Sequence, residues 1–331
     1  MNSTAMSLKP LEGKLAYLPV ALFGAVMGLT GLAVAWRIAH AQFGTPLWIA
    51  HAIGVLAHLA FAAQTLAYLI KAGTDFANVR AEFDHPIAGN LFGTPLVSLL
   101  LLPLLLAERH LALARVMWTV GAIAMVLFAW TIVMRWISAR QKPMHATPAW
   151  IVPAVGLIDV PLAVPALGWA DSLHGVMTFA TAVGLFFAIP LLTMILSRLI
   201  FEEPIPATLQ PSLLIMVAPF SVGFSAYVTT FGHIDAFAES LYMLMLFFLA
   251  LLFGRLRNLP GCPFRVSWWA VSFPLAASAT AALRYAAHTQ HIVANGIAIL
   301  LLAIATTIIG AISIRTLIGI ARGELRQLSS S

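Results

Sequence analysis

Residues 266–286 read VSWWAVSFPLAASATAALRYA, a long apolar stretch with Pro274 inside it. Small side chains follow the proline, in the order Ala276, Ala277, Ser278 and Ala279. A proline within a helix removes a backbone hydrogen bond and bends the helix, and membrane helices tolerate this where neighbouring helices or a cavity satisfy the freed carbonyl. The stretch therefore predicts a bent membrane-spanning helix with a face small enough for close packing.

Similar apolar stretches recur along the whole chain of 331 residues, of which 61% are hydrophobic and only 9% charged. Such a composition is typical of a multi-spanning membrane protein. Runs of about 18 or more apolar residues predict ten spans, at 15–39, 46–71, 90–108, 113–137, 149–170, 173–198, 209–231, 236–254, 266–286 and 292–318. The loops between them are short and leave no room for a soluble catalytic domain.

Every odd span carries a proline near or within it, and the five are Pro19, Pro95, Pro153, Pro219 and Pro274. Glycines follow three of these prolines: Gly24 and Gly28 follow Pro19, Gly156 follows Pro153, and Gly223 follows Pro219. A bend repeated in every odd span indicates that the odd helices line a pore and that the even helices insulate it from lipid. The predicted fold is all-α, with ten transmembrane helices arranged as five helical hairpins around a central pore.

The basic residues predict the orientation of these spans. Fourteen Lys and Arg residues fall on the side of the two termini, whereas the other side holds only Arg37, Arg109, Arg115 and Arg284. This bias predicts that both termini are cytoplasmic. It also explains the net charge of +6 without nucleic acid as a partner. Residues 1–14 and 321–331 are then predicted cytoplasmic tails, and residues 15–320 form the transmembrane pore domain.

No enzyme motif is present, because the chain contains no phosphate-binding glycine loop, zinc-binding His-Glu-x-x-His helix, CxxC pair or serine nucleophile elbow. We therefore predict that the protein is not an enzyme and needs no metal or cofactor. The single cysteine, Cys262, excludes an intrachain disulfide. His51 and His58 lie seven residues apart on one face of the second span, which leaves haem ligation as an alternative to hydrogen bonding between helices.

Four charged residues are candidates for a functional role. Asp159 is the only carboxylate near the middle of a span, and an intramembrane acid is a functional hypothesis because burying its charge is costly; it is a candidate for proton coupling. Glu202 and Glu203 flank a proline in an inner loop, where a solvated or salt-bridged role is favoured. Arg284 lies near the outer end of the ninth span and is a candidate for attracting anions to that mouth.

The odd-span prolines and several local motifs together resemble a known family. The motifs are Trp268 to Leu275 (WWAVSFPL), Phe83 to Pro86 (FDHP), His145 to Trp150 (HATPAW), Pro211 to Leu213 (PSL) and Ala218-Pro219. Over essentially the whole chain, this pattern resembles the tellurite-resistance/dicarboxylate transporter family, which includes slow-type anion channels. The resemblance implies five hairpins around a quasi-fivefold axis and a homotrimer with one pore in each subunit.

The resemblance also implies that a phenylalanine of the ninth helix plugs the pore, and the matching residue is Phe273. Independently of the family, Phe273 lies near the centre of its span beside Pro274, where its ring could block a narrow path. Two transport functions are open: a channel for small inorganic anions, or a proton-coupled carrier of C4-dicarboxylate, sulfite or tellurite-type oxyanions using Asp159. The resemblance favours the bacterial inner membrane as the location, and a haem-binding redox subunit using His51 and His58 is a third alternative.

Overall fold

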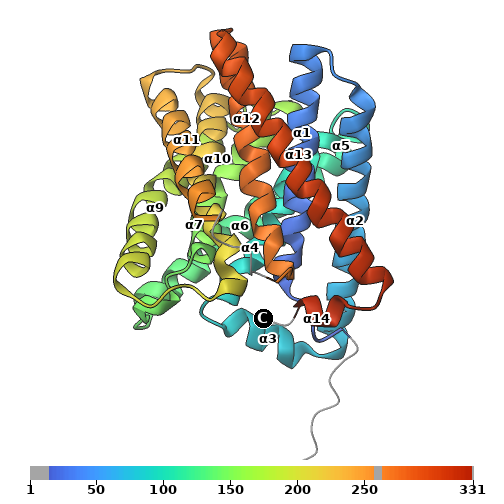
Figure 1. Ribbon diagram of the computed structural model, residues 1–331, viewed down its shortest axis with the longest axis vertical. Coiled ribbons are helices and arrows are strands. Elements are labelled where there is room, and N and C mark those ends of the chain that lie inside the picture. The colour runs from blue at the N-terminus through green and yellow to red at the C-terminus, as the bar shows by residue number, and fades with distance from the viewer. Residues whose placement is uncertain (1–14, 257–262, 330–331) are drawn as a thin grey trace, which may run out of the picture.

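The computed structural model describes residues 15–256 and 263–329, and every regular element within these ranges is a helix (Figure 1). The predicted fold class, an all-α membrane protein, is confirmed. The predicted N-terminal tail, residues 1–14, lies outside the described ranges. The same holds for Cys262 and for the last two residues of the chain.

Nine helical segments in the described part of the chain are long and apolar enough to cross a membrane. They are Val20–Phe43, Leu47–Thr74, Ala88–Leu106, Leu111–Ser138, His174–Phe201, Ala207–Phe231, Ala236–Gly254, Val266–Thr289 and Ile292–Ala321. The predicted fifth span, 149–170, is instead a shorter apolar helix at Pro148–Ala163. A 3-10 turn, Pro165–Leu167, and Gly168 with φ of +72° follow it, so that the chain turns away early.

Consecutive spans pack as antiparallel neighbours. The long helix of each pair is α2 (Leu47–Thr74), α6 (Leu111–Ser138), α9 (His174–Phe201), α11 (Ala236–Leu256) and α13 (Ile292–Ala321). Their respective partners are α1 (Gly24–Phe43), α4 (Gly93–Leu101) with α5 (Pro103–Leu106), α7 (Ile151–Val155) with α8 (Val160–Ala163), α10 (Ala218–Phe231) and α12 (Ser272–Thr289). This pairing agrees with the predicted helical hairpins, although the fifth span is too short to complete a count of ten long helices.

The partner helices close into a ring, and we call them the inner segments. Helix α1 contacts α4 and α12, α4 contacts α7 and α8, and α10 contacts both α8 and α12. Most of the buried side chains lie within this ring, whereas α2, α6, α9, α11 and α13 expose large apolar side chains such as Trp48, Trp130 and Phe186. The inner segments therefore form the core, and the long helices present an apolar surface to the bilayer.

All five inner segments begin with a 3-10 helix and then continue as an α-helix. The five 3-10 helices are η1 (Val20–Phe23), η2 (Ala88–Phe92), η4 (Pro148–Trp150), η7 (Ala207–Val217) and η8 (Val266–Val271). Four of the odd-span prolines stand at the second or third residue of the α-helix that follows, and Pro19 stands just before η1. The prolines thus mark the change from 3-10 to α-helix instead of a kink deep inside a span, because the first turn of an α-helix tolerates a missing N–H.

Two short helices cover the end of the bundle at which the inner segments begin. Helix α3 (Phe76–Asp84) follows α2, and α14 (Leu325–Ser329) follows α13; both lie at the bottom of Figure 1. A further 3-10 turn, η3 (Pro143–His145), precedes η4, and another, η5 (Gly156–Asp159), joins α7 to α8. We call this side of the bundle the α3 end and the opposite side the far end.

Candidate functional site: a cavity inside the ring

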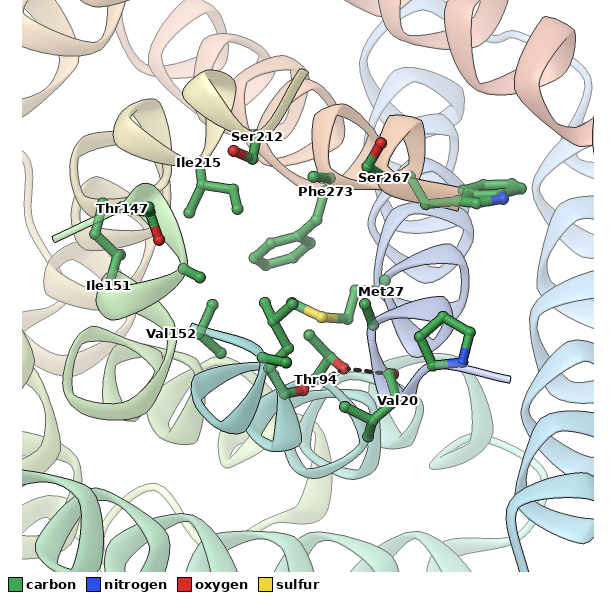
Figure 2. A pocket seen from close by; sticks show the side chains of 18 of the residues that line it. Val20, Met27, Thr94, Thr147, Ile151, Val152, Ser212, Ile215, Ser267 and Phe273 are labelled. Atoms are coloured by element: carbon green, nitrogen blue, oxygen red, sulfur yellow. Dashed lines mark hydrogen bonds between the residues drawn. The ribbon is translucent and has the colours of Figure 1, made fainter. Parts of the chain in front are cut away.

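A cavity of about 300 Å³ lies inside the ring, and every inner segment contributes to its wall. One residue from each segment illustrates the arrangement: Met27, Thr94, Val152, Ile215 and Phe273 (Figure 2). The wall is mostly apolar, and the ionisable residues among its lining are Glu82, His85, Asp159 and Arg265. A cavity of this kind has few groups that could hold a ligand in one fixed orientation.

The side chain of Phe273 projects into this cavity from the start of α12 and is 9% exposed (Figure 2). The backbone of α1 passes close to one side of its ring, because a Cβ added to Gly31 would lie 3.7 Å from Phe273 Cδ2. The closest atom to that Cβ would be Ala276 Cβ, at 3.0 Å, so Gly31 lets α1 approach α12 closely beside the ring. Toward the far end of α12, the next residues on the same helical face are small, since Ala277 and Ala281 follow at intervals of four.

Three hydroxyl groups on the cavity wall donate to backbone carbonyls, whereas Thr147 Oγ1 has no hydrogen-bond partner within the described residues. Thr94 Oγ1 lies 2.7 Å from Leu91 O and 3.1 Å from Val20 O. Leu91 O is the carbonyl four residues before Pro95, so the hydroxyl replaces the N–H that the proline lacks. Ser212 and Ser267 donate to Leu209 O and Thr208 O in the same way, at 2.6 and 2.5 Å.

Asp159 lies on the cavity wall at the end of η5 and is 2% exposed. Its Oδ1 has no hydrogen-bond partner within the described residues. A buried carboxyl oxygen without a partner is costly, so its presence points to a role beyond packing.

Arg284 lies on α12 eleven residues after Phe273, which is close to three helical turns and hence the same face. Its Nη1 donates to Thr229 Oγ1 at 2.9 Å and to Ser225 O at 3.3 Å, both on α10. No carboxylate within the described residues forms a salt bridge with it, since the ion pairs found there involve other residues. Arg284 is thus a cation on the inner ring toward the far end, outside the cavity.

Six of the residues predicted as functional line the cavity: Pro19, Gly24, Gly156, Asp159, Phe273 and Pro274. The structure places Gly28, Pro95, Pro153, Pro219 and Gly223 outside its lining. Gly28 and Gly223 serve packing, because an added Cβ would lie 2.1 Å from Ser272 Oγ in the first case and 2.8 Å from Leu185 Cδ2 in the second.

The remaining candidates lie apart from the cavity. His58 Nδ1 is 2.7 Å from Gly54 O of its own helix, and no cluster of three potential metal ligands occurs in the described part of the chain. Glu202 and Glu203 are exposed after the end of α9, as a solvated loop would be.

Sequence reasoning missed several lining residues. Thr94 could have been found from its position beside Pro95, and Met27 from its place one turn after Gly24. Glu82 and Leu328 gave no signal, because they belong to α3 and α14, which follow the membrane spans and reach the cavity only in the folded chain.

A ring of apolar helices around a narrow cavity is the architecture of a membrane transport protein, and comparison with known proteins identifies the kind. Residues 17–317 match the family described as SLAC1, voltage-dependent anion channel, and the chain belongs to this family. The resemblance to the tellurite-resistance/dicarboxylate transporter family is thereby confirmed. The prediction that the chain is not an enzyme is confirmed as well, since the family consists of channels and transporters.

Proteins from plants and bacteria are similar in sequence to this chain. The chain is 28% identical over 308 residues to the S-type anion channel SLAH3 of Arabidopsis thaliana, which covers 91% of this chain and 48% of the plant protein. It is 24% identical over 311 residues to the guard cell S-type anion channel SLAC1 of the same plant, covering 91% and 55%. A tellurite resistance protein TehA homolog of Haemophilus influenzae is 27% identical over 316 residues, covering 93% and 92%. The chain thus spans about half the length of these two plant relatives.

Proposed function

We propose that this protein is an anion channel, in which small monovalent anions pass through the cavity inside the ring and Phe273 closes the passage. The observation that carries the proposal is the phenylalanine ring projecting into a cavity that all five inner segments line (Figure 2). The names of the plant relatives, S-type anion channels, support the same activity.

The direction of the inner segments favours anions. All five begin at the α3 end, and a residue of each N-terminal 3-10 turn lines the cavity: Val20, Ala88, Ala149, Thr208 and Val266. Helix N-termini carry partial positive charge from their unpaired N–H groups. Five such ends around one cavity attract anions and repel cations at its entrance.

The weakly polar wall favours small anions that need no dedicated binding group. Among its charged side chains, Arg265 donates to the backbone oxygen of Gln327. Arg284, farther along α12, adds a positive charge that can draw anions through from the far end. Such a pathway discriminates by width and charge sign.

We infer the location and the orientation of this channel in the membrane from the charge distribution and the architecture. The excess of Lys and Arg on the side of the termini supports a cytoplasmic α3 end. The protein then lies in the bacterial inner membrane with both termini cytoplasmic, and residues 15–320 form the pore domain between two tails. We further propose a homotrimer in which each subunit has its own pathway.

Electrical recording of the purified protein in planar bilayers tests the channel proposal. Under a chloride gradient, we expect a current that reverses near the chloride equilibrium potential and that nitrate can carry as well. Protein-free bilayers and an unrelated membrane protein of similar size serve as controls. Saturable uptake without measurable current would contradict a channel.

The unpartnered carboxyl of Asp159 on the cavity wall favours a second candidate, a proton-coupled carrier of dicarboxylates or oxyanions. If transport is coupled through this acid, Asp159→Asn should abolish pH-driven uptake of malate or sulfite into vesicles, because asparagine cannot carry the proton. A channel should retain its chloride current in the same variant.

A further inference from the structure

An ion pair between α2 and α3 stands at the entrance of the cavity. Lys71 Nζ lies 2.8 Å from Glu82 Oε2, and Lys71 is only 3% exposed. Glu82 is the member of the pair that lines the cavity. A carboxylate therefore forms part of the wall of the proposed anion pathway, and a buried ammonium group stands directly behind it.

Further hydrogen bonds fix the orientation of both groups. Lys71 Nζ also donates to Leu18 O at 2.6 Å. Glu82 Oε1 accepts from the Val20 N–H at 2.7 Å, and Oε2 accepts from the Tyr68 hydroxyl at 3.0 Å. These contacts join α2 and α3 to each other and to the start of the first inner segment.

The environment of this pair determines the charge that an ion meets. Besides Glu82, the cavity wall contains one other carboxyl group, that of the buried Asp159, and the basic side chains His85 and Arg265. Salt screens a buried pair much less than a surface pair. Loss of one partner of a buried pair leaves an uncompensated charge. Without Lys71, Glu82 would present a negative charge at the entrance, which attracts cations and repels anions.

We propose that Lys71 determines charge selectivity: by neutralising the Glu82 carboxylate, it keeps the entrance permissive for anions. Lys71 acts as a positioning and charge-compensating residue, since Glu82 and not Lys71 lines the cavity. This inference rests on the proposed channel function. A purely structural role of Lys71 would change only the amount of folded protein. The proposed role predicts, in addition, a change in which ions pass through the folded protein.

The test is the reversal potential in planar bilayers under a sodium chloride gradient, which gives the ratio of chloride to sodium permeability. We expect Lys71→Met to lower this ratio by about tenfold, as a single uncompensated charge near the path can do. The double variant Lys71→Met/Glu82→Gln should return the ratio to the wild-type value, since it removes both charges. Glu82→Gln alone should raise the ratio, because Lys71 is then unpaired.

A matched control comes from α3, the short helix that carries Glu82. Arg80 lies 3.8 Å from Asp84, with side chains 77% and 60% exposed, so Arg80→Met removes a cation from a solvated pair away from the cavity. We expect the ratio to stay at the wild-type value in this variant. An unchanged ratio in Lys71→Met would overturn the inference, as would an equal fall in the single and double variants.

Two further outcomes separate the inference from the channel proposal. If Lys71→Met does not fold, an unchanged ratio in Glu82→Gln still overturns the inference, because that variant alters the same charge balance in the opposite direction. If neither the wild type nor Phe273→Ala passes current, the channel proposal itself fails and the inference fails with it. Wild-type current with unaltered selectivity in these variants removes the inference alone.

Discussion

Phe273→Ala should raise the chloride conductance by roughly tenfold or more, since lowering a barrier by about 1.4 kcal/mol already accelerates passage tenfold. The ring is the part of α12 that enters the cavity, and alanine would leave that space open (Figure 2). Some loss of stability is expected as well, because Phe273 is 9% exposed and belongs to the buried core. The measurement is single-channel recording beside the wild type, with thermal unfolding in detergent as the check on folding.

A matched control for this variant is Phe186→Ala on α9, whose ring is 68% exposed on the outer surface. Its conductance should equal that of the wild type. Phe273→Leu should give an intermediate conductance, as leucine fills part of the same space. A folded Phe273→Ala protein with wild-type conductance would rule out this residue as the plug.

Gly28→Ala should destabilise the protein by about 1–3 kcal/mol, the usual effect of inserting a group into a packed core. An added Cβ would lie 2.1 Å from Ser272 Oγ and 2.4 Å from Ser272 Cβ, which are distances that force α1 and α12 apart. Ser272 has little freedom to move, because it is fully buried and donates to Trp269 O at 2.7 Å. Thermal unfolding and the yield of folded protein measure the effect.

Gly310→Ala in α13 is the control, because nothing lies within 4 Å of its added Cβ. Alanine there should stabilise the helix by up to about 1 kcal/mol, since glycine is a poor residue inside helices. Gly28→Ala/Ser272→Gly should recover part of the loss by removing the closest atoms. Equal stability of Gly28→Ala and the wild type would show that α1 and α12 can separate at low cost.

Much of the fold follows from the sequence because membrane spans are long and nearly uniform in character. The apolar stretches predict the helices, and the odd-span prolines separate the inner segments from the outer ones. The fifth span shows where this reasoning ends: hydropathy extends it to residue 170, but Pro161, Pro165 and Gly168 shorten the helix. Hydropathy measures transfer into lipid and carries no information on backbone geometry.

The candidate site was less predictable, because a residue's place on the cavity wall depends on helix rotation. Gly24 lines the cavity and Gly28 does not, although both belong to the same run of small residues. Lys71 counted toward the basic side of the membrane, yet its side chain is buried against Glu82. Leu328, from a predicted tail, reaches the cavity wall only through the fold. Such contacts join residues far apart in the chain, and one sequence gives no sign of them.

The hydroxyl groups of the cavity wall bear on hydration. Because Thr94, Ser212 and Ser267 donate their protons to backbone oxygens, they offer a passing anion no proton in place of the water molecules that it sheds. Thr147 Oγ1 is an exception, since it lines the cavity and has no hydrogen-bond partner within the described residues. With so few free donors, an anion that enters must carry most of its water along or lose it largely without replacement. Ions that hold water weakly lose less in this exchange. The passage should consequently rank anions by dehydration cost, with nitrate and iodide ahead of chloride, and chloride ahead of fluoride.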